Sequence, residues 1–218
     1  MLINEIFKSI QGESSFAGLP CTFVRLTGCN LRCSYCDTEY SFYDGYEMSV
    51  DEVIREIRVS RNKLVEITGG EPLIQKDVYP LAKRLLSDGY TVLIETNGSI
   101  DLKELKGCCS KNDRGRLHII MDIKTPNSGE SSKMDFGNIS LLTSNDEVKF
   151  VMVDRDDYDW SKGIINKYRF PEGCKILFSP VYGKLQPYKL AEWIIEDCLP
   201  VRLQLQLHRY IWKRKTRV

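Results

Sequence analysis

The sequence predicts an α/β fold, in which a parallel sheet with crossover helices closes into an incomplete β/α barrel of about six strands. Two observations predict this fold. Apolar, strand-like runs alternate with helix-like runs along most of the chain, which is the rhythm of βα units. The 218 residues are enough for one sizeable domain and few for two, so we expect a single domain over residues 1–218.

The expected strands are short apolar runs, rich in β-branched and aromatic residues. In chain order they are 21–26, 63–68, 91–96, 117–123, 147–153, 174–179 and 201–207. These six or seven strands are fewer than the eight of a full barrel, so we expect the barrel to stay open. The stretch before residue 11 is also apolar and strand-like in character.

The expected helices occupy residues 49–60, 78–88, 156–169 and 187–198. At the first of them, Ser49 and Glu52 have the spacing of a capping box, and the apolar residues fall on one face. The polar segment 125–138 is expected to form a long loop. The basic tail 213–218 is expected to be a solvated end.

The composition argues against several classes of function. The formal net charge of +1 argues against bulk attraction to nucleic acid or to a membrane surface. No apolar run reaches the ~18 residues of a membrane span, and the first residues include an acid, unlike a signal peptide. The expected location is therefore cytoplasmic. Eight cysteines in a chain that can bury a core indicate metal ligands or free thiols rather than disulfides.

Polar motifs follow four of the expected strands. A cysteine-rich loop follows 21–26, TGGEP begins at residue 68, ETNG begins at residue 95, and DIKTP begins at residue 122. Ligands of α/β proteins bind outside the carboxyl ends of parallel strands, where these motifs would meet. We therefore expect the four motifs to form one site.

Cys29, Cys33 and Cys36 form a C-x3-C-x2-C motif. Three thiolates do not complete a tetrahedral metal ion, and no second Cys or His pair follows within the roughly 12 to 20 residues typical of a zinc site. A four-iron cluster held by three cysteines would leave one iron open, so that it can bind a small chelating molecule and pass it an electron. A zinc-binding or electron-transfer module is the non-enzymatic alternative.

This motif, with Tyr35 just before the last cysteine, resembles the signature of the radical S-adenosylmethionine (radical SAM) superfamily. The GGE at residues 69–71 resembles a second motif of that superfamily. Within it, the chain is similar to the 7-carboxy-7-deazaguanine synthase family, because QGE, FVRLTGCNLRC, CDT, TGGEPL, ETNG, VKFV and LQLH occur in order. The alternative enzyme is a glycyl-radical enzyme activase of the same superfamily, which would be expected to lack QGE and CDT.

The resemblance implies a lyase of queuosine and 7-deazapurine biosynthesis. It would convert 6-carboxy-5,6,7,8-tetrahydropterin into 7-carboxy-7-deazaguanine with loss of ammonia. The implied cofactors are a [4Fe-4S] cluster, S-adenosylmethionine and Mg²⁺, and the radical derived from them would be the catalytic agent, with no catalytic side chain beyond it. The implied partners are the pterin substrate, an external one-electron donor of the flavodoxin or ferredoxin type, and a second copy in a homodimer, without nucleic acid or membrane.

The resemblance also implies roles for individual residues. The implied cluster ligands are Cys29, Cys33 and Cys36. The residues expected to bind S-adenosylmethionine are Tyr35, Cys36, Asp37, Gly70, Asp122, Ile123, Lys124, Ser179, Pro180, Val181 and Tyr182. The residues expected to bind substrate are Ile10, Gln11, Gly12, Glu13, Arg25, Thr68 and His208, the last of which would end the final strand. The other cysteines, at 21, 108, 109, 174 and 198, are expected to be ordinary thiols.

For three of these residues, the chemistry of the side chain also bears on the implied role. The planar guanidinium of Arg25 suits the carboxylate of the substrate, although a surface salt bridge is the other interpretation. For magnesium, which prefers hard oxygen ligands, the resemblance implies Thr38, whereas charge alone favours Asp37. Both residues remain candidates from the sequence. This chain departs from the family where Ser14 replaces a common glycine, and in DIK and SPVY, so backbone contacts follow more directly there than side-chain contacts.

Overall fold

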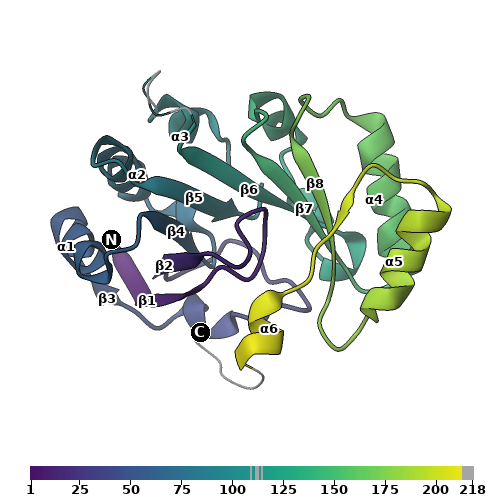
Figure 1. Cartoon of the computed structure of the whole chain (residues 1–218), viewed down its shortest axis with the longest axis horizontal. Helices are drawn as coiled ribbons and strands as arrows, with labels where there is room; N and C mark the ends of the chain where they lie inside the picture. Colours follow the sequence, from purple (N-terminus) through teal and green to yellow (C-terminus); the bar gives the residue numbers. More distant parts are fainter. Residues whose placement is uncertain (109, 111–112, 114, 213–218) are drawn as a thin grey trace.

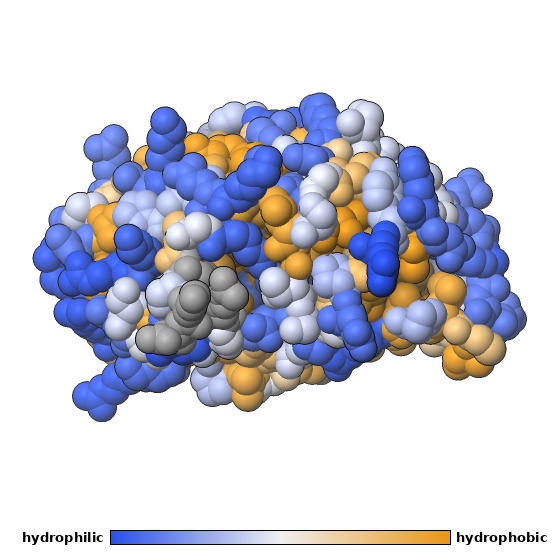
Figure 2. Space-filling view, turned by 90° about the horizontal axis from the view of Figure 1, so that it is seen from above, coloured by the Kyte–Doolittle hydropathy of each residue, from blue (hydrophilic) through white to orange (hydrophobic). Residues whose placement is uncertain are grey.

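The computed structural model describes residues 1–108, 110, 113 and 115–212. The prediction that Cys109 is an ordinary thiol and the prediction of a solvated tail at 213–218 lie outside the described residues. None of the helices in the described part of the chain is both long and apolar enough to cross a membrane. Figure 2 shows one face of the molecule, on which hydrophilic side chains surround scattered apolar patches.

A single nine-stranded sheet runs through the described residues, in the order β3-β1-β2-β4-β5-β6-β7-β8-β9. From β2 onward every neighbouring pair is parallel, whereas β1 and β3 pair antiparallel at the other end. The strands are β1 (Leu2–Ile10), β2 (Pro20–Leu26), β3 (Tyr46–Glu47), β4 (Leu64–Gly69), β5 (Thr91–Thr96), β6 (Leu117–Lys124), β7 (Glu147–Met152), β8 (Lys175–Pro180) and β9 (Arg202–Leu203).

The expected parallel, barrel-like sheet is confirmed, with six parallel strands of six residues or more and the two-residue β9. The apolar stretch before residue 11 forms β1, which pairs antiparallel with β2. It was not among the strands expected for the parallel sheet. Figure 1 shows the strands curving around a common centre with the longer helices outside them. The sheet is therefore a half-closed barrel with one concave face.

The helices confirm the four that the pattern predicts. They are α1 (Val50–Ser60), α2 (Val78–Ser87), α4 (Arg155–Lys167) and α5 (Pro187–Glu196), with α3 (Lys103–Gly107) and α6 (Leu207–Trp212) as short additions. The capping box of α1 is present, since Ser49 accepts a hydrogen bond from the Glu52 amide and the Glu52 carboxylate accepts one from the Ser49 amide. Such a cap stabilises a helix by about 0.5–2 kcal/mol. Segment 125–138 contains only short 3-10 turns, as expected for a loop.

The prediction of a long strand at 201–207 is wrong beyond Leu203. The segment makes one more sheet hydrogen bond, from Gln204 N to Phe178 O at 2.8 Å, and then leaves the edge of the sheet. Leu207 N instead donates to Gly12 O at 2.8 Å, and α6 begins at Leu207. His208 therefore lies in a helix and does not end a strand. Among the described strands, β9 is at the edge of the sheet and pairs with β8 only. The alternating pattern of its sequence therefore does not determine at which residue the pairing ends.

The two faces of the sheet differ in chemistry. The outer face packs against the helices in one large apolar core that includes Val24, Ile67 and Phe150. The concave face begins with a small apolar cluster of Cys21, Phe23, Leu64, Leu93 and Ile120. Further along the same strands, toward their carboxyl ends, the inward positions are polar or charged and line a cavity. Period-2 alternation along each strand separates the core from the candidate site.

Candidate active site

A cavity of about 340 Å³ opens at the carboxyl ends of the parallel strands. Residues from all four polar motifs line it: the cysteine loop after β2, the TGGEP turn after β4, the ETNG turn after β5 and the end of β6. The C-terminal segment contributes Gln206, His208 and Arg209 from another side. The four motifs thus meet in one place, as the sequence predicts.

Nearly every residue singled out from the sequence borders this cavity. They are Ile10, Gln11, Gly12, Glu13, Arg25, Cys29, Cys33, Tyr35, Cys36, Asp37, Thr38, Thr68, Gly70, Asp122, Lys124, Ser179, Pro180, Val181, Tyr182 and His208. Ile123 is the exception, because strand alternation turns Asp122 and Lys124 inward and puts the Ile123 side chain in the outer core, 1% exposed.

The cysteine loop is fixed by backbone hydrogen bonds on two sides. Gly28 O accepts from Glu71 N at 2.9 Å, which joins the loop to the TGGEP turn. Ser34 N donates to Ser128 O at 3.0 Å, which joins it to segment 125–138. That long loop therefore acts as a support for the cysteines.

The three thiols are free and partly buried, and backbone amides already point at two of them. Leu31 N lies 3.4 Å from Cys29 Sγ, and the Thr38 amide donates to the sulfur of Cys36. Burial raises the pKa of the Cys33 thiol to about 11, so a bound cation is needed to keep it as a thiolate at neutral pH. Within the described residues no three Cys, His, Asp or Glu side chains converge on one metal ion. The thiols border an open space instead, which fits a cluster in which each cysteine binds a different iron.

Gly70 allows the TGGEP turn to approach the cysteine loop. A Cβ at this position would lie 2.2 Å from Gly28 O and 2.6 Å from the Cβ of Cys29. Neither atom can move without displacing the loop, so only glycine fits here. The close approach also leaves bare backbone facing the cavity next to the cysteines.

Glu71 joins two of the turns from a fully buried position. Its carboxylate accepts hydrogen bonds from Leu73 N at 3.0 Å, Thr96 Oγ1 at 2.8 Å and Asn97 N at 2.6 Å. The TGGEP turn and the ETNG turn are thereby locked to each other. A buried carboxylate with three donors is well satisfied, which keeps this wall of the cavity rigid.

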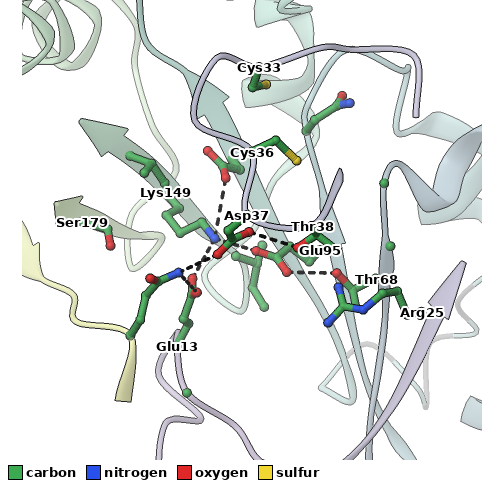
Figure 3. Close-up of a pocket in the computed structure, with 18 of the residues that line it drawn as sticks. Glu13, Arg25, Cys33, Cys36, Asp37, Thr38, Thr68, Glu95, Lys149 and Ser179 are labelled. Atoms are coloured by element: carbon green, nitrogen blue, oxygen red, sulfur yellow. Dashed lines mark hydrogen bonds and ion pairs between the residues drawn. The ribbon is translucent and has the colours of Figure 1, made fainter. Parts of the chain in front are cut away.

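Lys149 lies at the centre of a charged floor, as Figure 3 shows. Its Nζ lies 2.8 Å from Glu13 Oε2, 2.5 Å from Glu95 Oε1 and 3.6 Å from Asp122 Oδ2. Burial alone would lower the pKa of Lys149, but these carboxylates raise it well above its ordinary value. Burial would raise the pKa of Glu95, but Lys149 and the Thr68 hydroxyl bring it down to about 2. Lys149 and Glu95 therefore both stay ionised at neutral pH.

Glu66 lies two residues before Thr68 on β4 and faces the same side of the sheet. Its pKa is shifted in the opposite direction from that of Glu95. Burial, followed by the charges of Glu95 and Glu13, raises its pKa well above the ordinary value. Its carboxyl group is hydrogen-bonded to the side-chain amide of Gln11. Gln11 Oε1 in turn accepts from Glu13 N at 3.0 Å. Glu66 thus orients the Gln11 amide, which holds the QGE stretch against the sheet.

Asp37 and Thr38 are bonded to each other and to the C-terminal segment. Thr38 Oγ1 donates to Asp37 Oδ1 at 3.0 Å. Asp37 Oδ2 accepts from Arg209 at 2.9 Å and from Gln206 at 3.4 Å, and Gln206 also donates to Glu13 at 3.0 Å. The Asp37 side chain is 48% exposed, and although partial desolvation would raise its pKa, the Thr38 hydroxyl and Arg209 lower it overall. Both carboxylate oxygens are therefore engaged, while the Thr38 oxygen keeps its lone pairs.

Arg25 is not a surface residue, and its guanidinium both pairs with a neighbouring carboxylate and lines the cavity. Its side chain is 15% exposed, and its Nε lies 2.8 Å from Glu5 Oε1, which also accepts from Tyr40 at 2.9 Å. Its guanidinium borders the rings of Phe7 and Tyr40, each with its centroid 5.8 Å away. The pair with Glu5 fixes one edge of the guanidinium, and the group lines the cavity.

The opposite wall is formed by Tyr35 and the SPVY turn. The Tyr35 hydroxyl donates to Val151 O at 3.0 Å, and burial raises its pKa to about 12. Val181 N donates to Met152 O at 2.9 Å, which fixes the turn at the end of β8. Tyr182 remains 59% exposed and stacks under Arg209.

His208 lies against Gly12. A Cβ on Gly12 would meet the Nδ1 atom of His208 at 2.2 Å, so the ring occupies the space that a side chain would need. Burial lowers the pKa of His208, although Glu13 opposes this. The imidazole therefore closes the side of the cavity next to Gly12 in its neutral form.

Several residues that line the cavity were not predicted as site residues, among them the charged or hydrogen-bonding residues Glu66, Glu95, Lys149, Gln206 and Arg209. Glu95 belongs to the ETNG motif and Lys149 to the VKFV motif. Together with Glu66 they are charged residues inside apolar strands. A charge in a buried strand is rarely left unpaired, and this signal would have identified them. No comparable signal exists for Gln206 and Arg209, whose role depends on how the C-terminal segment folds back.

Comparison with known proteins gives consistent results. The model of the Radical SAM superfamily matches residues 23–170. A 7-carboxy-7-deazaguanine synthase of Koribacter versatilis is 42% identical over 232 residues, covering 100% of this chain and 99% of that relative. The enzyme of the same name from Chlorobaculum tepidum is 43% identical over 218 residues, covering 99% of this chain and 96% of that relative.

Solved structures show the same fold. QueE from Escherichia coli superposes with a TM-score of 0.76 at 23% identity, and the match covers 95% of this chain and 94% of that one. SuiB from Streptococcus suis, bound to its precursor peptide SuiA, gives a TM-score of 0.56 at 14% identity over 88% of this chain and 50% of that one. The full-length relatives do not favour the activase alternative.

Proposed function

Because the chain belongs to the Radical SAM superfamily, and within it to the 7-carboxy-7-deazaguanine synthases, we propose that it converts 6-carboxy-5,6,7,8-tetrahydropterin into 7-carboxy-7-deazaguanine with loss of ammonia. The observation that carries the proposal is that three cysteine thiols and a charged, hydrogen-bonding floor share one cavity. The thiols suit a metal cluster, and the floor suits a polar ring. An electron-transfer module would need only the first of these.

Cys29, Cys33 and Cys36 would hold a [4Fe-4S] cluster, which fits their free thiols and the amides that already donate to Cys29 and Cys36. When bound, the cluster and S-adenosylmethionine supply the one-electron chemistry that removes a hydrogen atom from the substrate. The share of this chain is to bind and orient both molecules and to keep water away.

The residues proposed to bind S-adenosylmethionine surround the cysteine loop. Gly70 offers bare backbone beside Cys29, and the turns at 35–37 and 179–182 form walls on other sides. Asp122 supports the proposal most directly. The residue lines the cavity, and its Oδ1 atom is buried and has no hydrogen-bond partner among the residues that the structure describes. A hydroxyl or ammonium group of S-adenosylmethionine would satisfy it.

The residues proposed to bind the pterin lie on the charged floor. Arg25 would hold the substrate carboxylate, because a guanidinium pairs with a carboxylate through two parallel hydrogen bonds. Gln11, Glu13 and Thr68 offer an amide, a carboxylate and a hydroxyl to the amide and amino groups of a pterin edge. His208 would lie over the same region.

Thr38 is proposed as the magnesium ligand of the chain. Its proton points to Asp37, and so its oxygen can face a cation, while both Asp37 oxygens are engaged by neighbours. One hydroxyl is a weak ligand, so substrate oxygens and water would complete the coordination shell. Asp37 would then orient the ligand instead of binding the metal.

Four further expectations are part of the proposal. The continuous sheet over the described residues supports one domain spanning 1–218. The homodimer and the flavodoxin- or ferredoxin-type electron donor rest on the family resemblance, and sedimentation and exchange of reductants would test them. A cytoplasmic location follows from the need of free thiolates for a reducing compartment.

The cluster is tested by anaerobic reconstitution followed by iron analysis and visible absorbance. We expect about four irons per chain and a brown protein that cleaves S-adenosylmethionine once reduced. Alanine at Cys29, Cys33 or Cys36 should abolish the absorbance, whereas Cys198→Ala, at an exposed cysteine, should retain it. A Cys33→Ala protein that stays brown with full iron would contradict the ligand set.

A further inference from the structure

Asn97, in the turn that follows β5, places its side chain next to one of the cysteines. It is 5% exposed, and its Nδ2 atom lies 3.9 Å from Cys29 Sγ and 3.0 Å from Asn30 Oδ1. The first distance is that of a hydrogen bond to sulfur. Asn97 belongs to the ETNG motif, which was expected at the site, but the sequence assigns no role to its side chain.

The orientation of the Asn97 amide is determined by its other contacts. Asn97 Oδ1 accepts from Ser99 N at 3.0 Å and from Ser99 Oγ at 2.6 Å. A backbone amide can only donate, so the side-chain atom facing Ser99 is the oxygen and the atom facing Cys29 is the NH₂ group. Asn30 Oδ1 takes one of the two amide protons, which leaves the second for the sulfur.

The backbone of Asn97 is held as firmly as its side chain. Its N–H donates to Glu71 Oε2 at 2.6 Å, and the neighbouring Thr96 hydroxyl donates to the other oxygen of the same fully buried carboxylate at 2.8 Å. Glu71 N also donates to Gly28 O, directly before Cys29, at 2.9 Å. One residue, Glu71, thus holds both the Asn97 donor, through its side chain, and the Cys29 loop, through its backbone N–H.

We propose that Asn97 is a positioning residue that donates a hydrogen bond to the Cys29 sulfur and thereby raises the reduction potential of the cluster, an inference that rests on the cluster of the proposed function. A hydrogen bond to a ligand sulfur withdraws negative charge from it, which favours the more negative, reduced state of the cluster. Of the three cysteines, Cys29 receives both a backbone donor from Leu31 and this side-chain donor. Cys29 is therefore a corner of the site at which two neutral donors stabilise added negative charge on the sulfur.

The test is a redox titration of the reconstituted protein, followed by the electron paramagnetic resonance of the reduced cluster, without S-adenosylmethionine or substrate. Asn97→Leu removes the donor, and Asn97→Asp replaces it with a negative oxygen. We expect both variants to have a more negative midpoint potential than the wild type, with Asn97→Asp shifted further. Ser99→Ala is the matched control, because it keeps the backbone bond that orients the amide, and we expect its potential to match the wild type.

A midpoint potential of Asn97→Leu equal to that of the wild type, at full iron content, would overturn the inference. If the variants do not assemble the cluster, pulsed resonance on wild-type protein labelled with ¹⁵N-asparagine decides. We expect a weak nitrogen coupling that persists in Asn30→Asp, which lacks the other nearby amide nitrogen, and its absence would overturn the inference. Neither readout involves the pterin, so a negative result here leaves the proposed reaction standing, whereas a wild type without any cluster would sink both.

Discussion

Lys149 Nζ lies 2.5 Å from Glu95 Oε1 on the floor of the cavity, in a pair whose lysine is only 5% exposed. The two residues come from β7 and β5, on either side of β6, so their contact crosses the concave face. Glu13 adds a second carboxylate from the N-terminal loop at 2.8 Å. One ammonium group therefore holds together three parts of the chain that build the site.

Replacing Lys149 with Met should destabilise the fold strongly. The change leaves Glu13 and Glu95 as neighbouring carboxylates without their cation, and removing one partner of a buried pair costs about 3–5 kcal/mol. Urea denaturation would measure the loss. The double variant Lys149→Met, Glu95→Gln should recover part of it, and a single variant as stable as the wild type would show that the floor is not a structural ion pair.

The same pair predicts how stability depends on pH. Glu95 has a pKa of about 2 in the folded protein, below its ordinary value of 4.5, so its contribution to stability is present above about pH 4.5. It is lost as the pH falls toward 2, and it amounts to at most about 3 kcal/mol. Denaturation curves between pH 7 and pH 3 should show the wild type losing more stability than Glu95→Gln. Parallel losses in the two proteins would refute the assignment.

Arg25→Ala should weaken substrate binding with little effect on the cluster. A hydrogen bond to a charged group contributes about 1.5–3 kcal/mol, which corresponds to a rise of about 10- to 150-fold in the KM for the pterin. Steady-state kinetics at saturating S-adenosylmethionine would measure it. Glu5→Gln removes the charge of the partner of Arg25 Nε but keeps the guanidinium, so its KM should change much less. Equal effects would mean that Arg25 only supports the fold.

Magnesium titrations of Thr38→Ala and Asp37→Asn should separate the two candidate ligands. Loss of the Thr38 hydroxyl removes the proposed ligand, and we expect the magnesium concentration for half-maximal activity to rise about tenfold or more. Asp37→Asn keeps an oxygen that can accept from Thr38, so its shift should be smaller. A larger shift in Asp37→Asn would make the carboxylate the ligand.

Much of the site could be predicted from the sequence because its motifs follow strands. Parallel strands end at one edge, so the cysteine loop, TGGEP, ETNG and DIKTP had to meet once the strands were recognised. Glu95 and Lys149 were missed, although a charge inside an apolar strand marks each of them as a candidate; that they pair with each other follows only from the order of the strands. The pairing of β5, β6 and β7 supplies that order.

The C-terminal segment was the least predictable part. Its alternating sequence suggests a strand as far as residue 207, but pairing ends at Leu203 and α6 follows. Gln206 then reaches Glu13, and Arg209 reaches Asp37, across almost the whole length of the chain. Such contacts depend on where the segment leaves the sheet edge, which local patterns do not encode.

The most direct test of the proposed function is turnover by the reconstituted, reduced wild-type protein. It would be incubated anaerobically with S-adenosylmethionine, Mg²⁺ and 6-carboxy-5,6,7,8-tetrahydropterin, and the products would be followed by mass spectrometry. We predict that 7-carboxy-7-deazaguanine and ammonia form in equal amounts and that S-adenosylmethionine is regenerated. Cleavage of S-adenosylmethionine with the pterin left unchanged would contradict the assignment.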